Sequence, residues 1–331
     1  MLPLLLFAAT YATAIITPAC AAGGTAAAAG PLLLRQSVHA SDVLAVCNDG
    51  TQPSYYATPP RGASQNEWMI ILPSSGGSPQ AIPWCFPPAE SQWDLPNVLS
   101  NCFQSFPTAS SPQPVPPAAN ITIPCGGPHC IYSSNCTFNP TFCNFGKIVI
   151  PQCTFDNWLG DATRTFGNAS LRVTKHYRGQ RMLNATLAQI AKDLLNAKSK
   201  VLVAGNDGGG NLIYIQADRI GALLQGVANF PATSFAVVPI EGYWPNWNGY
   251  YEGYALQQTI TGQQDTKQHE VGGGNAWGFM NFSGAVNPAC VHGIDPSGNK
   301  PETHWRCLLA EFAGQYIKSR IFALEQVRYN G

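Results

Sequence analysis

The sharpest chemical feature of the chain is a glycine-rich turn, Gly205-Asn-Asp-Gly-Gly-Gly210, which follows an apolar run at 200–204. A strand that ends at Gly-x-x-x-Gly before a helix holds the central residue in a strained elbow and presents its side chain above the sheet. The neighbouring residues must be small because such a turn is crowded. The central residue here is Asp207, whereas hydrolases that use this turn carry a serine nucleophile there.

Two other interpretations of the turn stay open. A phosphate-binding loop would use the helix N-terminus to hold an anion. The turn lacks the Gly-Lys-[Ser/Thr] ending of a P-loop, however, and it does not fit Gly-x-Gly-x-x-Gly with a following acidic ribose ligand. The simpler interpretation is a strand-to-helix turn in which Asp207 caps the helix.

The elements around the turn follow from hydrophobic periodicity. An amphipathic helix is predicted over 181–196, because its apolar residues recur on one helical stripe, and a second helix follows the turn at about 211–225. Apolar runs predict strands at 68–72, 147–151, 200–204 and 234–239, with a last one within 317–327. Alternation of helices and strands around a tight glycine turn is typical of a mostly parallel α/β sheet with crossover helices.

The composition limits the classes of function. Only 11% of the 331 residues are charged, against about 25% in an ordinary soluble domain, and 18 basic residues balance 18 acidic ones. The chain therefore has no basic footprint for nucleic acid and no polybasic stripe for a membrane surface. Apolar residues make up 45%, which is enough for a sizeable core.

The N-terminus predicts a secreted protein. Residues 1–22 contain an apolar run, then Pro18 and a small-residue pattern at 19–21, as in a secretory signal peptide. A membrane anchor is the alternative, but the run is shorter than the ~20 apolar residues that a span needs. We expect signal cleavage, no membrane span afterwards, a flexible segment at 23–32, and a location outside the cell, at the cell wall or cell surface.

The cysteines predict disulfides. Removal of Cys20 with the signal leaves ten of the 11 cysteines, an even number that allows up to five bridges in an oxidising compartment. A metal site is the alternative for His129 and the four cysteines within 125–143, but their spacing lacks the close pairs of zinc ligands. We expect neither a metal nor another cofactor.

Acceptor triplets of the form Asn-x-[Ser/Thr] predict a glycoprotein. The triplets begin at Asn120, Asn135, Asn168, Asn184 and Asn281. One such match can arise by chance, whereas five in a chain with a predicted signal peptide support glycosylation. Asn184 lies within the predicted helix, so we expect it to be poorly exposed.

Several separated blocks of the sequence share their order with one known family. The blocks are Cys47-Asn-Asp-Gly-Thr51, Trp68-Met-Ile-Ile-Leu-Pro-Ser-Ser-Gly-Gly77 with Trp84-Cys85, Ile150-Pro-Gln-Cys153, Tyr177-Arg-Gly-Gln-Arg181, the turn after 201, Gly242-Tyr243-Trp244 and Trp305-Arg-Cys307. Over about 47–325 the chain resembles the pectin acetylesterase and Notum family of secreted α/β-hydrolases. The resemblance implies one α/β-hydrolase-like domain at 33–331, shortened at its C-terminal end, with a proline-rich insert at 106–119. We expect a monomer.

The resemblance also implies a site for carboxylic-ester hydrolysis. The oxyanion hole would be formed by the backbone of Gly208 and by the loop at Gly76 and Gly77. The aromatic stretch 241–254, with Trp84, suggests a pocket for an acylated polysaccharide or another acyl-group ligand, because aromatic rings stack on sugars and line acyl pockets. The expected lining residues are Trp84, Tyr243 and Trp244.

The catalytic triad of the family does not carry over. Asp207 occupies the nucleophile position, and the family's acid aligns with Tyr329 or Asn330, so that Glu325 comes too early. The family's histidine base would follow the acid, after Gly331. We therefore expect a chain that is inactive as a serine esterase. The alternatives are a hydrolase that uses Asp207 in an altered mechanism, a non-enzymatic glycan- or acyl-binding protein, and a partial product of a longer reading frame.

Overall fold

The computed structural model describes residues 32–48, 50–73, 121–122, 131–154, 156–167, 172–243 and 281–325. The predicted signal peptide and the proline-rich insert lie outside these residues. The chain divides into two compact units, one of residues 1–31 and 122–143, the other of residues 32–121 and 144–331. The extent of the predicted domain at 33–331 stays a prediction. No helix in the described ranges is both long and apolar enough to cross a membrane.

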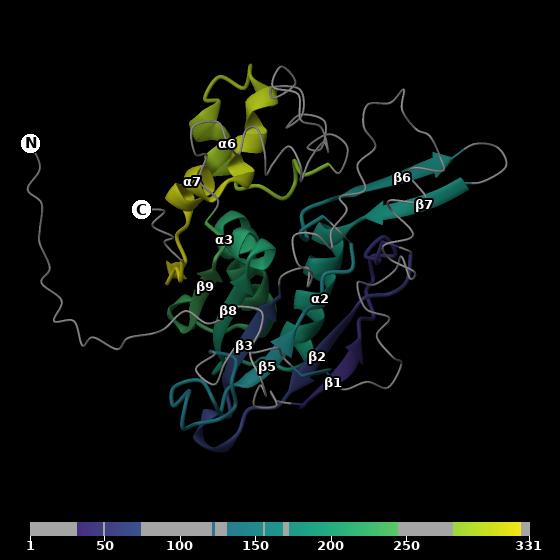
Figure 1. The fold of residues 1–331 in the computed structure, drawn as a ribbon. Helices are drawn as coiled ribbons and strands as arrows, with labels where there is room; N and C mark the ends of the chain where they lie inside the picture. Colours follow the sequence, from purple (N-terminus) through teal and green to yellow (C-terminus); the bar gives the residue numbers. More distant parts are fainter. Residues whose placement is uncertain are drawn as a thin grey trace, which may run out of the picture. The chain divides into compact units, whose positions relative to one another are not determined.

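The main sheet has eight strands and is mostly parallel, which confirms the predicted fold class (Figure 1). Its strand order is β10-β9-β8-β3-β5-β2-β1-β4. The strands from β10 to β5 run parallel, whereas β2 pairs antiparallel with β5 and with β1. The bounds are β1 Leu32–Ser37, β2 Ser54–Thr58, β3 Glu67–Leu72, β4 Ile121–Thr122, β5 Gly146–Val149, β8 Lys200–Asn206, β9 Phe235–Ile240 and β10 Arg320–Ile321.

The central strands are almost entirely apolar because they are buried on both faces. In β3 the residues from Trp68 to Leu72 are all buried, and they pair in register with Val201 to Gly205 of β8. The unbroken apolar runs that predicted these strands therefore correspond to the middle of the sheet.

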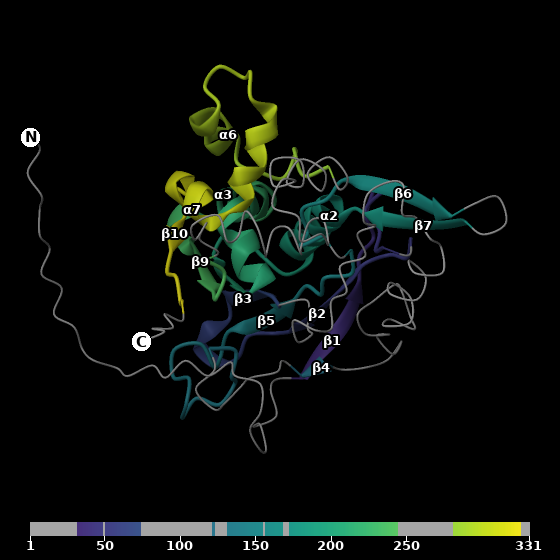
Figure 2. The same cartoon turned by 45° about the horizontal axis from the view of Figure 1, so that its top comes forward.

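Two helices lie side by side over one side of this sheet (Figures 1 and 2). Helix α2 spans Gly179–Asp193, and its buried positions include Met182, Leu187 and Ile190, as the helical stripe predicted. Helix α3 spans Gly208–Ala228, so it begins within the glycines of the turn. The predicted helices at 181–196 and 211–225 are both present, with shifted ends.

The remaining elements are short. A separate ribbon pairs β6 (Ala162–Gly167) antiparallel with β7 (Arg172–Tyr177). The short helices are η1 Gly62–Ser64, η3 Ala232–Ser234, α6 Pro288–Ile294, η6 Pro301–Leu308, α7 Ala310–Ala313 and η7 Gly314–Tyr316.

The predicted last strand is shorter than expected. Within the described part of this range, which ends at 325, only Arg320–Ile321 forms β10, and a single further bridge joins Leu324 to Ile240. The strand cannot begin earlier because the backbone N–H groups of Lys318 and Ser319 donate to a side chain of α3. The apolar run therefore overestimated the paired length.

Three disulfides join described cysteines, which confirms the prediction for six of them. The bridges are Cys47–Cys153, Cys136–Cys143 and Cys290–Cys307. Two cysteines of the cluster considered as a metal site, Cys136 and Cys143, are bonded to each other. Among the described residues no group of three or more His, Cys, Asp or Glu side chains is arranged to hold a metal ion.

Candidate active site

Asp207 lies in a strained elbow between β8 and α3. Its backbone has φ 52° and ψ −112°, a conformation with positive φ that is uncommon for a residue other than glycine. The Asp207 N–H donates to Ile240 O at 2.8 Å, and Asp207 O accepts from Asn211 N at 2.8 Å. The elbow is therefore held from the neighbouring strand on one side and from the first turn of α3 on the other.

Close backbone packing around the elbow requires its glycines. A Cβ added at Gly209 would lie 2.0 Å from Leu72 O at the end of β3. A Cβ at Gly205 would lie 2.2 Å from Gly209 O. The geometry of the elbow thus depends on the absence of side chains beside Asp207, whatever residue occupies position 207.

A second loop lies against the residue that follows Asp207. Asn157 has a positive φ of 52°, and its Oδ1 is 2.9 Å from the position that a Cβ of Gly208 would occupy. Gln152 Nε2 donates to the same Oδ1 at 3.3 Å. The amide of Asn157 therefore stands next to Gly208, which the resemblance assigns to the oxyanion hole, and Gln152 holds that amide. No sequence motif pointed to Asn157 or Gln152 beyond their place near Cys153.

A buried carboxylate fixes this loop. Asp156 accepts hydrogen bonds from Thr154 Oγ1 at 2.6 Å, from Gly179 N at 2.8 Å and from Trp158 N at 3.1 Å. Burial raises the pKa of Asp156 to about 6, and these hydrogen bonds oppose the rise. Because Gly179 is the first residue of α2, the carboxylate ties the loop with Asn157 to the start of that helix.

Glu325 directly follows the last paired residue of the sheet, Leu324. Its neighbour Leu324 pairs in parallel with Ile240, so Glu325 follows the sheet at the same edge as the elbow. The Glu325 carboxylate accepts from Tyr214 Oη at 3.0 Å and from Tyr243 N at 3.1 Å, and burial raises its pKa. The resemblance aligns the family's acid with Tyr329 or Asn330, which lie outside the described residues, so that alignment stays a prediction.

Tyr243 is the one proposed pocket residue whose surroundings are described. The residue is 42% exposed, and its ring meets that of Tyr214 edge to face with centroids 5.8 Å apart. The other expected site residues, Gly76, Gly77, Trp84 and Trp244, lie outside the described residues. The structure therefore brings together Asp207, Gly208 and the end of β9, and leaves the rest of the expected pocket a prediction.

Three histidines, His269, His292 and His304, occur late in the chain, and none holds the position of the family's base. His304 Nε2 lies 3.1 Å from Asp295 Oδ2. Burial opposes ionisation of Asp295, but hydrogen bonds from Lys300 N and His304 outweigh it and lower the pKa to about 2. His292 lies in α6, and His269 is outside the described residues. The described side-chain contact of His304 is therefore with Asp295.

The glycosylation candidates differ in exposure. Asn135 and Asn281 are exposed, and Asn281 Oδ1 accepts from the hydroxyl of Ser283 at 2.7 Å. Asn184 is only partly exposed within α2, and the hydroxyl of Thr186 in its triplet is buried and donates to a helix carbonyl. Asn120 and Asn168 lie outside the described residues.

Comparison with known proteins gives a family model and two kinds of relative. A model described as pectinacetylesterase matches residues 25–329. Palmitoleoyl-protein carboxylesterase notum2 of Xenopus laevis is 24% identical over 184 residues, which are 56% of this chain and 32% of the relative. Palmitoleoyl-protein carboxylesterase NOTUM of Mus musculus is 24% identical over 194 residues, 59% of this chain and 31% of the relative. The matches thus span about a third of these relatives.

Solved structures share the fold over most of the chain. Two crystal forms of the Wnt deacylase Notum from Drosophila superpose with TM-scores of 0.62 and 0.60, at 18% and 17% sequence identity. Each comparison covers 89% of this chain and 71% of the solved chain. At this level of sequence identity, the resemblance shows a shared fold.

Proposed function

The chain belongs to the pectinacetylesterase family, and from this premise we propose that its elbow site receives the carboxylic ester of an acylated substrate without hydrolysing it by a serine mechanism. The observation that carries the proposal is the position of Asp207. Asp207 is the strained residue between β8 and α3, where the family's fold presents its nucleophile. The chain keeps the scaffold of the reaction and has a different reacting group.

Acyl transfer at this site would meet an electrostatic obstacle. In a serine esterase the hydroxyl gives its proton to a base and then attacks the carbonyl carbon. The tetrahedral intermediate is an oxyanion, which backbone N–H groups such as that of Gly208 would stabilise. A carboxylate at Asp207 has no hydroxyl proton to give, and its negative charge would repel that oxyanion.

The second acidic group does not restore the triad. Glu325 lies at the end of the strand next to β9, a suitable place for the acid that orients a histidine. Its carboxylate is already held by Tyr214 and by the backbone of Tyr243. We infer that Glu325 positions Tyr243 beside the elbow rather than serving a catalytic base.

Ester hydrolysis tests this proposal directly. The purified chain is incubated with p-nitrophenyl acetate and with acetylated pectin, and released nitrophenol or acetate is measured against the Asp207→Ala variant. We expect no difference between the two proteins. Turnover by the native chain that disappears in Asp207→Ala would overturn the inactive assignment and identify Asp207 as a nucleophile or base.

Binding without hydrolysis is the second candidate function. It is favoured by Tyr243, whose half-exposed ring stands on Tyr214 close to the elbow and could stack on a sugar face. Acetylated oligogalacturonides should then raise the melting temperature of the native chain, and Tyr243→Ala should remove the increase. The same melting temperature with and without the oligosaccharide would exclude this function for that ligand.

We also propose that the protein is a secreted glycoprotein, located outside the cell. Three disulfides are typical of an oxidising compartment, and Asn135 and Asn281 are exposed acceptors. Expression in a glycosylating host should deliver the chain to the medium with a mass that falls on treatment with an N-glycosidase. Asn281→Gln should remove one increment of mass, while Asn184→Gln should leave the mass unchanged.

A further inference from the structure

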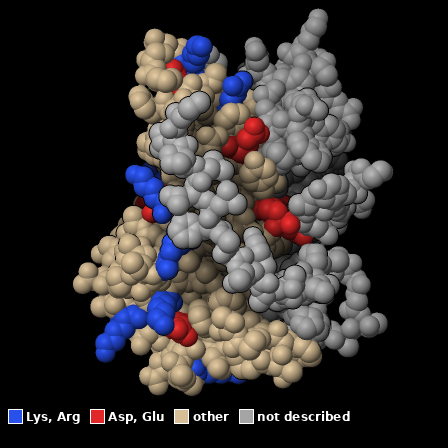
Figure 3. Space-filling model, turned by 90° about the vertical axis from the view of Figure 1, so that its left-hand side faces the viewer, with Lys and Arg blue, Asp and Glu red and all other residues tan. Residues whose placement is uncertain are grey.

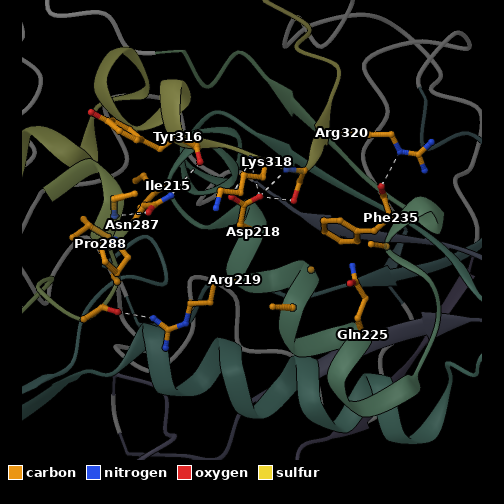
Figure 4. Close-up of a pocket in the computed structure, with 18 of the residues that line it drawn as sticks. Ile215, Asp218, Arg219, Gln225, Phe235, Asn287, Pro288, Tyr316, Lys318 and Arg320 are labelled. Atoms are coloured by element: carbon orange, nitrogen blue, oxygen red, sulfur yellow. Dashed lines mark hydrogen bonds between the residues drawn. The ribbon is translucent and has the colours of Figure 1, made fainter. Parts of the chain in front are cut away.

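A cavity of about 770 Å³ lies beside α3, away from the elbow (Figure 4). It extends along α3 from Ile215 to Gln225 and is completed by the first residues of β9 and β10 and by the segment that enters α6. Small-molecule sites have volumes of about 300–1,000 Å³. The cavity meets β9 at Phe235, whereas Asp207 bonds to Ile240 at the other end of that strand. The two ends are roughly 16 Å apart at about 3.3 Å per residue.

The inner lining of the cavity is apolar. Phe235 is buried, and a Cβ added at Gly221 would lie 2.8 Å from its ring. Glycine at this position of α3 therefore gives the aromatic ring its place beside the cavity. Val286, Pro288 and Tyr316 line another part of the wall. A ligand seated here would contact hydrocarbon and aromatic groups along most of its length.

Three of the chain's 18 Lys and Arg residues line the same cavity: Arg219, Lys318 and Arg320. Arg219 Nη1 donates to Gly284 O at 2.6 Å, and Arg320 donates to backbone carbonyls at the start of β9 and just before it. These carbonyls fix the guanidinium groups without neutralising their charge. None of the three cations forms an ion pair with a described residue.

The single acidic residue of the lining, Asp218, accepts hydrogen bonds from backbone N–H groups. Asp218 accepts from Lys318 N at 3.0 Å, from Ser319 N at 2.7 Å and from Ser319 Oγ at 2.6 Å (Figure 4). This contact attaches the segment before β10 to α3. Three cations and one acid leave the lining with an excess of two positive charges.

This excess is local. Figure 3 views the side of Figure 1 on which α6, α7 and β9 lie, and among its coloured residues basic side chains are interspersed with acidic ones. The chain as a whole has a formal net charge of zero. A long polyanion would need an extended basic surface, so the cavity fits a small anion better.

We propose that this cavity binds a small organic carboxylate with an apolar body, of the size of a medium-chain fatty acid. Its carboxylate would pair with Arg219 and Lys318, because guanidinium and ammonium groups form charge-assisted hydrogen bonds with carboxylates. Its hydrocarbon body would lie over Gly221 and against the ring of Phe235. The site is separate from the elbow and does not depend on any chemistry at Asp207.

Calorimetric titration of the full chain with decanoate tests the proposal. Arg219→Gln removes the charge and should weaken decanoate binding about tenfold, as expected for loss of one charged hydrogen bond. Ala222→Phe places a ring in the cavity from an exposed position of α3 and should abolish binding. The matched control is Lys192→Gln, which removes a cation from the exposed face of α2 and should bind like the native chain.

The neutral analogue decanamide separates charge recognition from apolar contact, and it should bind about tenfold more weakly than decanoate. Urea midpoints show whether each variant is folded, and Lys318→Gln replaces Arg219→Gln if the loss of the Gly284 contact destabilises the chain. Absence of decanoate binding, equal binding by the native chain and Ala222→Phe, or equal affinity for decanoate and decanamide would overturn the proposal. None of these results depends on whether the elbow binds or hydrolyses esters.

Discussion

The buried carboxylate of Asp156 should make the stability of the protein fall between about pH 4 and pH 6. Burial disfavours its ionised form and raises the pKa from 3.8 to about 6. Below pH 3.8 the group is protonated in both the folded and the unfolded chain. As the pH rises, the unfolded chain ionises first, so the unfolded state is stabilised until the native pKa is passed.

The size of the effect follows from the same two pKa values. The native and unfolded pKa values differ by about two units. At 1.36 kcal/mol per unit, this difference amounts to about 3 kcal/mol in the free energy of unfolding. This is a large part of the roughly 5–15 kcal/mol by which domains are stable. The part of the free energy of unfolding that depends on protonation of Asp156 is therefore fully present below pH 3.8 and is lost as the pH rises through 6.

Urea unfolding of the native chain and of Asp156→Asn, measured from pH 4 to pH 8, checks this reasoning. The asparagine does not titrate, so the difference in stability between the two proteins should shrink or change sign as the pH increases. Asp193→Asn, at an exposed position of α2, controls for the loss of one carboxylate. The opposite slope would refute the argument, since it would mean that the donors from Thr154, Gly179 and Trp158 stabilise the ionised form more than burial destabilises it.

Further predictions concern the elbow, the carboxylate of Asp295 and a disulfide. Gly209→Ala should lower the free energy of unfolding by more than about 3 kcal/mol, because its Cβ would lie 2.0 Å from a carbonyl of β3; the control Gly226→Ala, which meets no atom within 4 Å, should raise it by about 0.5–1 kcal/mol. The pKa of Asp295 is lowered to about 2, so its contribution to stability should be present above pH 3.8 and lost as the pH falls to 2. Acid unfolding of Asp295→Asn should lack this loss of stability, and a pH profile equal to that of the native chain would contradict the prediction. Replacing both Cys290 and Cys307 by serine should lower the free energy of unfolding by about 3 kcal/mol in urea, given a loop of 17 residues; an unchanged midpoint would show that the bridge adds nothing.

The elbow shows how a fold can keep its geometry when its reacting residue differs. The shape of the turn depends on glycine contacts such as that of Gly209 with Leu72 O, and on the hydrogen bonds of the Asp207 backbone to Ile240 and Asn211. None of these contacts involves the side chain at position 207. The sequence could therefore change there without loss of the turn, whereas Gly205 and Gly209 leave no room for a side chain.

The sequence by itself determined the middle of the molecule. Unbroken apolar runs specified β3, β5, β8 and β9, because strands buried on both faces need apolar side chains on both. The helical stripe at 181–196 specified α2, and the glycine spacing specified the elbow at Asp207. These features depend on local spacing, which a sequence records directly.

Only the tertiary structure decided what lies around the elbow. The place of Glu325 depends on the pairing of Leu324 with Ile240, and that of Asn157 on how Asp156 ties its loop to α2. The cavity beside α3 likewise joins Arg219 to Lys318, which are 99 positions apart in the chain. Contacts between distant segments are set by strand register and helix packing, and no local pattern of residues specifies either.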